Sequence, residues 1–262
     1  MDNNTCLYEE IKVSIITPSF NSKKTLLNTY QSILAQTHKN WEWIIVDDFS
    51  TDSTREILTE IYLNERDRVK VFYNEKNLGA AASRNYALQH VQGDFIAFID
   101  SDDKWMPQKL QKQIAFMNLD LKINFCFTAF ELIDSKDKKL GKIIDLQGDG
   151  YSFSYEDMLK KKATLGCSTV MLRNNVFKDL LMPIIVAGED YALWLKLLKT
   201  DNKAYLLSDV LAQYRILPGS LSRNKFKKSK KQWQVYRNIE KLSFFNSLNC
   251  FTSYAWRAVV RR

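Results

Sequence analysis

Residues 95–103 read FIAFIDSDD, an apolar run followed at once by a serine and three carboxylates. A short apolar run of this kind is typical of a strand that is buried on both faces of a parallel sheet. In open α/β sheets, ligands bind beyond the carboxyl ends of such strands. We therefore expect the strand Phe95 to Ile99 to present Asp100, Asp102 and Asp103 at the mouth of a binding site.

Several carboxylates at the end of one buried strand repel one another, and a divalent cation would remove that repulsion. Hard oxygen ligands with few protein donors suit Mn²⁺ or Mg²⁺ shared with a diphosphate. The alternative is a solvated turn before a helix at Pro107, since Asp is a common turn and cap residue. The spacing alone leaves both interpretations open.

The first two hundred residues alternate β-rich runs with helical patterns, which predicts an α/β fold with a wound sheet. The expected strands are Val13 to Thr17, Trp41 to Val46, Val69 to Tyr73 and Phe95 to Ile99. The expected helices start at the cap candidates Asn21 and Ser22, at Thr54 (to Asn64) and at Ala80 (to Gln89). Their apolar positions share one face, so the helices should cover the sheet.

Beyond residue 103 the pattern is less regular. The expected elements are a helix from Pro107, a strand at Phe125 to Phe130, a hairpin or mobile loop at 134–150, a helix near Tyr155 to Lys162, a strand at Ser168 to Leu172 and a helix from Asp190.

Composition excludes several classes of protein. The hydrophobic share of 45% and the charged share of 26% are those of a packed globular domain. The four cysteines lie far apart with no C-x-x-C spacing, so a zinc site and a disulfide framework are not expected. No apolar run approaches the roughly 18 residues of a spanning helix, and no signal peptide is recognisable, so we expect a cytosolic protein.

Positive charge is concentrated toward the C-terminus. Residues 203–262 hold thirteen Lys or Arg against two acids, a net +11, and because the whole chain is +8 the first 202 residues sum to −3. This asymmetry indicates an anionic partner, either a phospholipid surface or nucleic acid. From Asn224 the spacing of apolar residues predicts an amphipathic helix, which would lie on an anionic membrane surface or pack on the preceding domain. The apolar positions of this helix are Phe226, Trp233, Tyr236, Ile239, Leu242 and Phe245. A similar apolar pattern continues at Phe251, Tyr254, Ala255, Ala258 and Val259.

Six short motifs follow one another between residues 11 and 215. They are Thr17-Pro18-Ser19-Phe20-Asn21, Ser32 to Gln36, Val46-Asp47-Asp48-Phe49-Ser50-Thr51-Asp52, Asn77-Leu78-Gly79, Ser83-Arg84-Asn85 and Asp100-Ser101-Asp102-Asp103. In this order and spacing they resemble family 2 glycosyltransferases. The resemblance implies the GT-A fold, a Rossmann-like wound mixed sheet with helices on both faces. The catalytic domain would span 1–223, with a nucleotide-binding half at about 11–103, an acceptor-side half at about 104–223, and a basic amphipathic helical tail at 224–262.

The resemblance also implies an activity. The expected reaction is an inverting, metal-dependent transfer of a sugar from a nucleoside-diphosphate donor, in bacterial members a UDP-sugar, to a hydroxyl of a glycan or lipid-linked acceptor. The products would be lipopolysaccharide, capsule or a related polysaccharide, made at the inner face of the cytoplasmic membrane. Mn²⁺ or Mg²⁺ would be the cofactor.

The resemblance assigns roles to particular side chains. Pro18 and Phe20 would line the base pocket, Asp48 would accept a hydrogen bond from uracil, and Arg84 would lie near the nucleotide. The donor-binding set it implies is Thr17, Pro18, Phe20, Asn21, Asp48, Asn77, Gly79, Arg84, Asp100, Ser101 and Arg223. Taken singly, these residues also suit a turn proline, a helix-capping aspartate and a surface arginine, and Asp52 is expected to cap a helix.

Asp102 would coordinate the metal directly, and Asp100 would also serve the metal while lying closer to the donor sugar or ribose. In Gly188-Glu189-Asp190, which resembles the family's acidic motif, Asp190 would be the general base that removes the acceptor hydroxyl proton. The alternative is that Glu189 and Asp190 only complement a helix N-terminus, a contribution of about 0.3–1 kcal/mol.

Tyr214-Arg215 and Ser220-Leu221-Ser222-Arg223 resemble the family's loop over the diphosphate. Family members often carry a His there, and this chain has none, so phosphate binding would fall to Arg223 or Arg215 unless the loop is simply solvated. Trp105 is more expected in the core than against a sugar. Cys167 is expected to be a small buried residue and not a nucleophile.

Other classes fit the motifs less well. A nucleotidyltransferase should show a Gly- and Arg-rich loop after the first strand, where this chain has Ser19-Phe20-Asn21-Ser22. A Rossmann dehydrogenase should show G-x-G-x-x-G at the same place. A non-catalytic nucleic-acid or membrane-binding protein would use the basic tail alone, and salt-sensitive oligonucleotide binding without nucleotide binding would support it. We expect no nucleic-acid partner, and no motif sets an oligomeric state.

Overall fold

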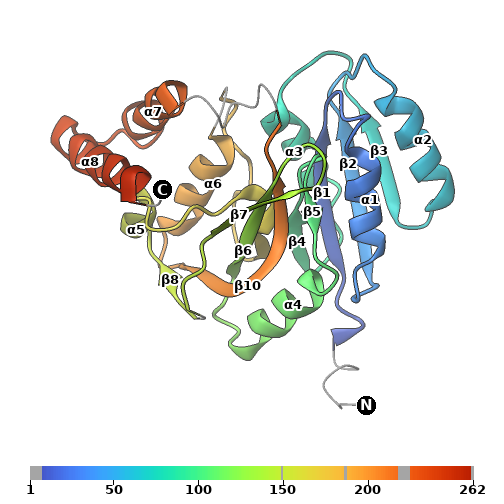
Figure 1. Ribbon diagram of the computed structural model, residues 1–262. Helices are drawn as coiled ribbons and strands as arrows, with labels where there is room; N and C mark the ends of the chain where they lie inside the picture. Colours follow the sequence, from blue (N-terminus) through green and yellow to red (C-terminus); the bar gives the residue numbers. More distant parts are fainter. Residues whose placement is uncertain (1–7, 149, 186–187, 218–224, 261–262) are drawn as a thin grey trace.

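The structure is a computed structural model that describes residues 8–148, 150–185, 188–217 and 225–260. Within these residues the strands join in one sheet of ten, in the order β3-β2-β1-β4-β9-β6-β10-β5, with β7 beside β6 and β8 beside β10 (Figure 1). The strands are β1 Val13–Ser19, β2 Trp41–Asp47, β3 Val69–Tyr73, β4 Phe95–Phe98, β5 Lys104–Trp105, β6 Phe125–Ile133, β7 Lys139–Ile144, β8 Ser152–Phe153, β9 Met171–Arg173 and β10 Ala204–Arg215.

Helices cover both faces of the sheet. The α-helices are α1 Leu26–Leu34, α2 Thr54–Asn64, α3 Ala80–Leu88, α4 Lys109–Leu119, α5 Tyr155–Leu159, α6 Glu189–Leu198, α7 Lys225–Gln234 and α8 Phe244–Val260. A 3₁₀-helix spans Cys167–Thr169 and a π-helix spans Val235–Ile239.

Two apolar cores lie on the two faces, because successive side chains of a strand point in opposite directions. In β1, Ile16 joins the core that contains α3, α6 and part of the tail, whereas Val13 and Ile15 join the core beneath α1, α2 and α4. Since β1 pairs in parallel with both β2 and β4, the strand order reverses between β1 and β4. Such a reversal opens a crevice at the carboxyl ends of the strands, where ligands bind.

The predicted GT-A type of sheet is confirmed, and the four early strands lie within two residues of their expected bounds. The irregular stretch 134–150 contains β7, which pairs antiparallel with β6 as a hairpin. The periodicity of the residues did not predict β5, β8 or β10. Of these, β10 matters most, because it lies parallel to β6 and ends at Arg215.

Several predicted elements differ in extent. The first helix begins at Leu26, with Thr25 as its N-cap, and not at Asn21 or Ser22. The strand expected from Ser168 begins only at Met171, because the Thr169 hydroxyl donates to the Gly166 carbonyl (2.7 Å) and local bonds of this kind compete with strand pairing. The helix expected to reach Lys162 ends at Leu159, and Lys161 has a left-handed backbone (φ 53°).

The tail packs on the catalytic part of the chain, which was one of the two expected arrangements. Tyr236 is fully buried and donates a hydrogen bond to the carbonyl of Leu159 (2.5 Å). Glu240 accepts a hydrogen bond from Tyr155 (2.5 Å) and pairs with Lys199 (2.9 Å). The tail is therefore part of the folded unit.

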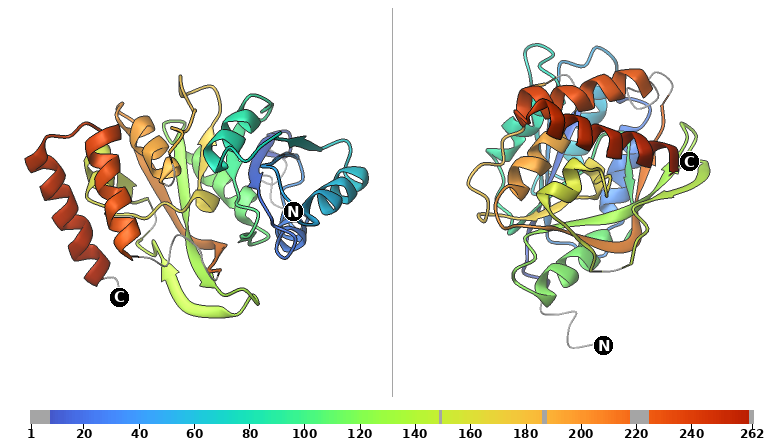
Figure 2. Two further views of the ribbon diagram at one scale, coloured as in Figure 1. Left: turned by 90° about the horizontal axis from the view of Figure 1, so that it is seen from above. Right: turned by 90° about the vertical axis from the view of Figure 1, so that its left-hand side faces the viewer.

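The tail contains more than one amphipathic helix, as expected, but the break falls within the stretch Phe226 to Phe245 that the apolar spacing predicted as one helix. After the π-helix the chain turns at Lys241, whose backbone is left-handed (φ 52°), and α8 then runs back beside α7 (Figure 2). The start of the predicted helix, Asn224, lies outside the described residues. None of the helices in the described part of the chain has the length and apolar character needed to cross a bilayer.

Replacing Tyr236 with alanine should lower the free energy of unfolding by about 3–5 kcal/mol, because a buried ring and its hydrogen bond are lost. The control Phe245→Ala removes a ring that is 80% exposed on the same tail and should change it by no more than about 0.5 kcal/mol. Guanidinium denaturation measures both values. Equally small effects would mean that the tail does not fold with the rest of the chain.

Candidate functional site

The loops that follow β1, β2 and β4 meet at one edge of the sheet, because these strands are parallel neighbours. The Ser22 hydroxyl, after β1, lies 2.6 Å from the Ser101 hydroxyl, after β4. The Asp48 N–H, after β2, donates to the Ser19 carbonyl (2.7 Å). Residues far apart in the sequence are thereby joined at the crevice.

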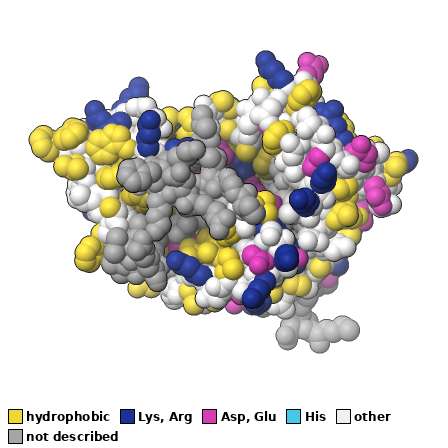
Figure 3. Space-filling view, turned by 45° about the horizontal axis from the view of Figure 1, so that its top comes forward, with side chains coloured by type: hydrophobic (Ala, Val, Ile, Leu, Met, Phe, Trp, Pro, Cys, Tyr) yellow, Lys and Arg dark blue, Asp and Glu magenta, His cyan; other side chains and the backbone are white. Residues whose placement is uncertain are grey.

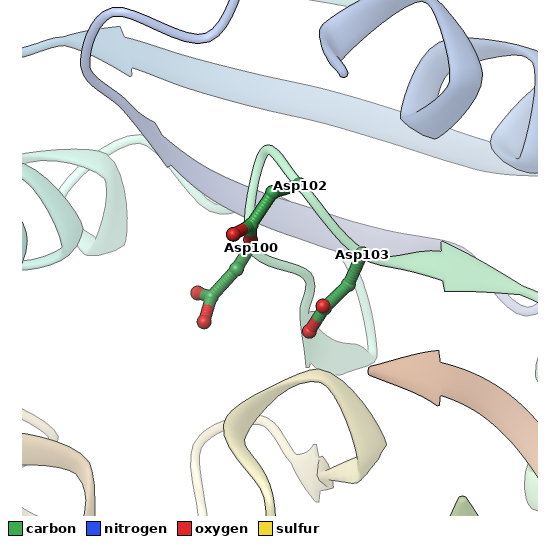
Figure 4. Close-up of side chains that lie close together, drawn as sticks. All are labelled: Asp100, Asp102 and Asp103. Carbon is green, nitrogen blue, oxygen red and sulfur yellow. The ribbon is translucent and has the colours of Figure 1, made fainter. Parts of the chain in front are cut away.

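Asp100, Asp102 and Asp103, which we call the aspartate cluster, bring their carboxylate oxygens within 4.8 Å of one another. Figure 4 shows the three side chains projecting to the same side of the loop after β4. Carboxylate oxygens at this spacing are a suitable donor set for Mg²⁺ or Mn²⁺. Asp103 was expected at this mouth with the other two but was not assigned a ligand role of its own, and its carboxylate completes the cluster.

The three carboxylates are not equivalent. Asp103 is buried, and its two oxygens accept hydrogen bonds from the Ser168 hydroxyl (2.6 Å) and the Arg215 N–H (2.9 Å). Asp100 accepts from the Arg84 guanidinium (2.5 Å). Among the described residues, no cationic side chain lies within ion-pair distance of Asp102. Asp102 is therefore the member best placed to hold a cation.

Burial and mutual repulsion act on the aspartate cluster. Burial, followed by the charge of Asp100, raises the pKa of Asp102 to about 6. Burial, followed by the charges of Asp102 and Asp100, raises the pKa of Asp103 well above its usual range. A divalent cation would favour the ionised forms, since an opposite charge lowers the pKa of a carboxyl group.

The start of α1 fixes the loop that carries the aspartate cluster. The Thr25 hydroxyl donates to the Ser101 carbonyl (2.9 Å), and the Thr29 hydroxyl donates to the Asp103 carbonyl (2.7 Å). All of these groups are buried or nearly so. Hydrogen bonds of this kind hold a polar loop in one geometry where water is excluded. The Ser101 hydroxyl lies 2.6 Å from that of Ser22, which ties the loop to the end of β1 as well.

Arg84 links the two halves of the site. It lies on α3, is only 4% exposed, and contacts Asp100 on one side and Glu189 (3.1 Å) at the start of α6 on the other. The sequence suggested a nucleotide contact for this residue, whereas in the structure its guanidinium is engaged by two carboxylates. Arg84 therefore sets the spacing between the loop of the aspartate cluster and the start of α6.

Asp48 organises the next loop. Its carboxylate accepts hydrogen bonds from the Asn74 amide (2.8 Å) and from the backbone N–H groups of Leu78 (2.8 Å) and Gly79 (2.7 Å). Gly79 has a positive φ of 88°, which only glycine adopts readily, and it begins α3. Asn77 lies exposed in the same loop. The Asp48 carboxylate thus holds the loop after β3 against the loop after β2.

The loop after β1 presents a mixture of buried and exposed groups. Thr17 and Pro18 are buried, and the Thr17 hydroxyl accepts from the Trp43 indole (2.8 Å). Phe20 is half exposed, as a base-stacking ring would be. The Asn21 amide oxygen accepts from the Thr51 N–H (2.8 Å), and Asn21 has a left-handed backbone (φ 49°). Left-handed residues other than glycine concentrate at functional sites.

Two residues near this loop were not found from the sequence. Asp47 is fully buried and accepts from Arg55 (2.8 Å), and the Arg55 guanidinium lies over the exposed rings of Phe49 (5.7 Å) and Tyr73 (5.3 Å). An Asp directly after a buried strand was the available signal for the first. Arg55 carries no such signal, because its partners come from three different segments.

Asp52 caps α2, as expected: its carboxylate accepts from the N–H of Thr54 (3.0 Å). Trp105 is buried and donates to the Ser168 carbonyl (2.7 Å), so it belongs to the core and not to a sugar-stacking surface. Cys167 is buried, and burial raises the pKa of its thiol, which agrees with the expected inert role.

Asp190 lies at the first turn of α6, after Gly188, whose backbone is left-handed (φ 84°). Burial, followed by the charge of Glu189, raises the pKa of Asp190 to about 6. Glu189, the neighbour of Asp190, pairs with Arg84 (3.1 Å), and Arg84 also pairs with Asp100 (2.5 Å). The start of α6 therefore lies close to the aspartate cluster.

Arg215 is an internal anchor. Its guanidinium donates to the carbonyls of Asp102 (2.6 Å) and Asp134 (3.1 Å) and pairs with Asp137 in the β6–β7 turn. These contacts fix the loop of the aspartate cluster against the hairpin. The other phosphate-binding candidate, Arg223, lies outside the described residues, as do Ser220, Leu221 and Ser222.

Comparison with known proteins identifies the family. The sequence model described as "Glycosyl transferase family 2" matches residues 14–181. TuaG of Bacillus subtilis, named for teichuronic acid biosynthesis, is 44% identical over 95% of this chain and 97% of its own length. WfgD of Escherichia coli, named as a UDP-Glc:alpha-D-GlcNAc-diphosphoundecaprenol beta-1,3-glucosyltransferase, is 39% identical over 87% of this chain and 86% of its own.

Solved structures show the same fold. TarS of Staphylococcus aureus, crystallised with UDP-GlcNAc, superposes with a TM-score of 0.71 at 22% identity, over 92% of this chain and 70% of that chain. A mannosyltransferase of Pyrobaculum calidifontis, solved with GDP-Man and Mn²⁺, gives a TM-score of 0.65 at 14% identity, over 95% and 70%. Together with the sequence matches, they place this chain in glycosyltransferase family 2, with the GT-A fold of that family.

Proposed function

We propose that this glycosyltransferase moves a sugar, with inversion, from a UDP-sugar to a hydroxyl of a lipid-linked glycan, and that a divalent cation assists the reaction. The observation that carries the proposal is the aspartate cluster, together with the Arg84 bridge from Asp100 to Glu189, which brings the start of α6 and Asp190 close to it. One side supplies ligands for a cation and a diphosphate, and the other supplies a carboxylate for the acceptor. The donor side would correspond to residues 11–103 and the acceptor side to 104–223.

The side chains present fit Mn²⁺ or Mg²⁺. Asp102 is the principal ligand in this proposal and Asp100 the second, because both oxygens of Asp103 are already hydrogen-bonded to Ser168 and Arg215. When bound, the ion offsets the charge that develops on the departing diphosphate. The mannosyltransferase solved with Mn²⁺ has the same fold, which supports an ion of this kind.

Asp190 serves as the general base. The acceptor oxygen attacks the anomeric carbon while the bond from that carbon to the β-phosphate oxygen breaks, UDP leaves, and Asp190 takes the hydroxyl proton. A base works best when its pKa is near the working pH, and Asp190 with a pKa of about 6 meets this requirement.

The donor pocket is formed by the loops after β1, β2 and β3. Phe20 offers an exposed ring for the base, and Asp48 and Gly79 shape the adjacent wall. The TarS structures were solved with UDP and with UDP-GlcNAc, and this supports UDP as the nucleotide. Thr17, Pro18, Asn21, Asn77, Arg84, Ser101 and Arg223 complete the set that we propose.

The acceptor is proposed from the relatives. WfgD and WfaP of Escherichia coli are both named for transfer to a diphosphoundecaprenol-linked sugar, and TuaG for teichuronic acid synthesis. An acceptor anchored in this way would bring the enzyme to the inner face of the cytoplasmic membrane. The product would be a lipopolysaccharide, capsule or related surface polysaccharide.

The Asp102→Asn variant should lose metal-dependent donor binding. With UDP and Mn²⁺, the wild-type protein should show a raised unfolding temperature, because a ligand that binds only the folded state stabilises it. In the variant this increase should vanish, while the unliganded variant should be at least as stable as wild type, since a buried repelling charge is removed. Differential scanning fluorimetry measures both. An undiminished shift with UDP and Mn²⁺ would exclude Asp102 as a metal ligand.

The Asp190→Asn variant should bind UDP with wild-type affinity but turn over about 10²–10⁴-fold more slowly, because general-base catalysis contributes on that order. Asp179→Asn is the matched control, since Asp179 is exposed and pairs with Lys196 of the same helix. Its turnover should match wild type. Release of UDP in the presence of acceptor measures both variants, and a wild-type rate for Asp190→Asn would rule out this base.

The rate should fall on the acid side of pH 6. Asp190 acts in its deprotonated form, and its raised pKa of about 6 means that this form is lost as the pH drops below that value. We expect kcat to be level above about pH 7 and to decrease about tenfold per pH unit well below pH 6. A pH profile at saturating donor, metal and acceptor tests this, and a level profile down to pH 4.5 would contradict it.

A further inference from the structure

We propose that α8 and the end of α7 form a docking surface for an anionic phospholipid bilayer. The proposal deepens the proposed function, because a lipid-linked acceptor lies in such a membrane. It assigns the membrane contact to one side of the tail, and the opposite side holds the catalytic domain.

The inner side of the tail is occupied by protein. Tyr236 and Val235 are buried against the core, and Glu240 is tied to Tyr155 and Lys199. In α8, Ser247 and Cys250 are buried. Removing residues 224–262 would therefore damage the catalytic domain, so a test of membrane binding requires point variants on the outer side.

The outer side of α8 is apolar and exposed. Large side chains that face solvent are Phe244 (55% exposed), Phe245 (80%), Leu248 (43%) and Trp256 (71%). At about 100° per residue these four positions fall within an arc of about 120° around the helix, and the buried Ser247 and Cys250 lie outside it. An exposed apolar face of this kind on a folded protein marks an interaction surface.

The aromatic residues form a continuous group. Trp233 of α7 contacts the rings of Phe244 (6.0 Å) and Phe251 (5.6 Å), and Phe244 contacts Phe245 (5.9 Å). In Figure 3, hydrophobic side chains gather over the tail at the left edge of the molecule, with Lys and Arg beside them. The exposed rings are thus held in place by their neighbours.

The tail as a whole is strongly positive. Residues 224–262 contain ten Lys or Arg and one acidic residue, Glu240. The charge of Glu240 is balanced by its ion pair with Lys199. Lys230, Arg237 and Lys241 are exposed in the described part of the tail. Aromatic and aliphatic side chains that enter the acyl boundary, flanked by Lys and Arg that meet phosphate groups, are the features of a helix lying on an anionic membrane.

Two other occupants fit less well. A second copy of this chain would bring together two tails of the same net charge, which repel. A protein that binds a single nucleic-acid strand presents its rings along a charged groove. Here the exposed rings lie on the outer, solvent-facing side of α8. The bilayer alone satisfies both the apolar arc and the basic flank.

The test uses full-length protein and co-sedimentation with vesicles of phosphatidylcholine alone or mixed with phosphatidylglycerol. Wild type should bind the mixed vesicles. It should bind the vesicles of phosphatidylcholine alone at least about tenfold more weakly. The double variant Phe245→Ser/Trp256→Ser should bind the mixed vesicles at least about tenfold more weakly than wild type. The control Leu119→Ser/Leu121→Ser removes equally exposed leucines (79% and 73%) near the end of α4 and should bind like wild type.

Unfolding temperature confirms that each variant is folded, and light scattering reports the oligomeric state. Equal binding by the double variant and the control, equal binding to both kinds of vesicle, or an oligomer that dissociates in the double variant would each overturn the proposal. Asp102→Asn should bind vesicles like wild type, and the double variant should still bind UDP with Mn²⁺. These two measurements separate failure of the membrane proposal from failure of the proposed function.

Discussion

The repulsion among carboxylates at the end of β4 is the constraint on which the site depends. Asp100, Asp102 and Asp103 are brought within a few ångströms of one another, Asp103 is buried and the other two are partly buried, and removal from water raises the cost of their charge. The surrounding structure compensates this cost only in part: Asp103 accepts hydrogen bonds from Ser168 and the Arg215 N–H, and Asp100 pairs with Arg84. In the proposed function, the charge of Asp102 is balanced by a bound cation.

The anchors of the aspartate cluster also determine where the acceptor side lies. Arg84 contacts Asp100 and Glu189, so the helix that carries Asp190 is fixed relative to the metal-binding loop. Arg215 ties the same loop to the β6–β7 turn. Such positioning matters because a displacement of about 1 Å between reacting groups is enough to lower a rate about a hundredfold.

Local patterns predicted the donor half well, because its strands and helices alternate regularly and its polar residues directly follow apolar runs, as Asp100 follows Phe95 to Ile99. The contacts that hold the candidate site together could not be predicted in this way, because they join residues that are far apart in the sequence. Arg84 and Glu189 are 105 residues apart, and Arg215 and Asp102 are 113 apart. From the sequence, Arg84 was therefore predicted to lie near the nucleotide and Arg215 to be a possible phosphate ligand. In the structure the guanidinium groups of both residues contact other parts of the protein. The spacing of apolar residues in the tail predicted amphipathic helices. It did not predict the turn at Lys241, and it did not predict that some apolar residues of the tail are buried while others are exposed.

We propose that Asp102 and the donor diphosphate share one divalent cation. Electron–nuclear double resonance of Mn²⁺ with UDP and an excess of protein examines this directly, because a phosphorus coupling shows a phosphate oxygen on the ion, and a spectrum that differs from that of free Mn²⁺–UDP shows that the protein holds the ion. Wild type should give the phosphorus coupling within such a protein-specific spectrum, and Asp102→Asn should give the spectrum of free Mn²⁺–UDP. Tight binding of UDP without Mn²⁺, or the wild-type spectrum in Asp102→Asn, would rule out the shared cation.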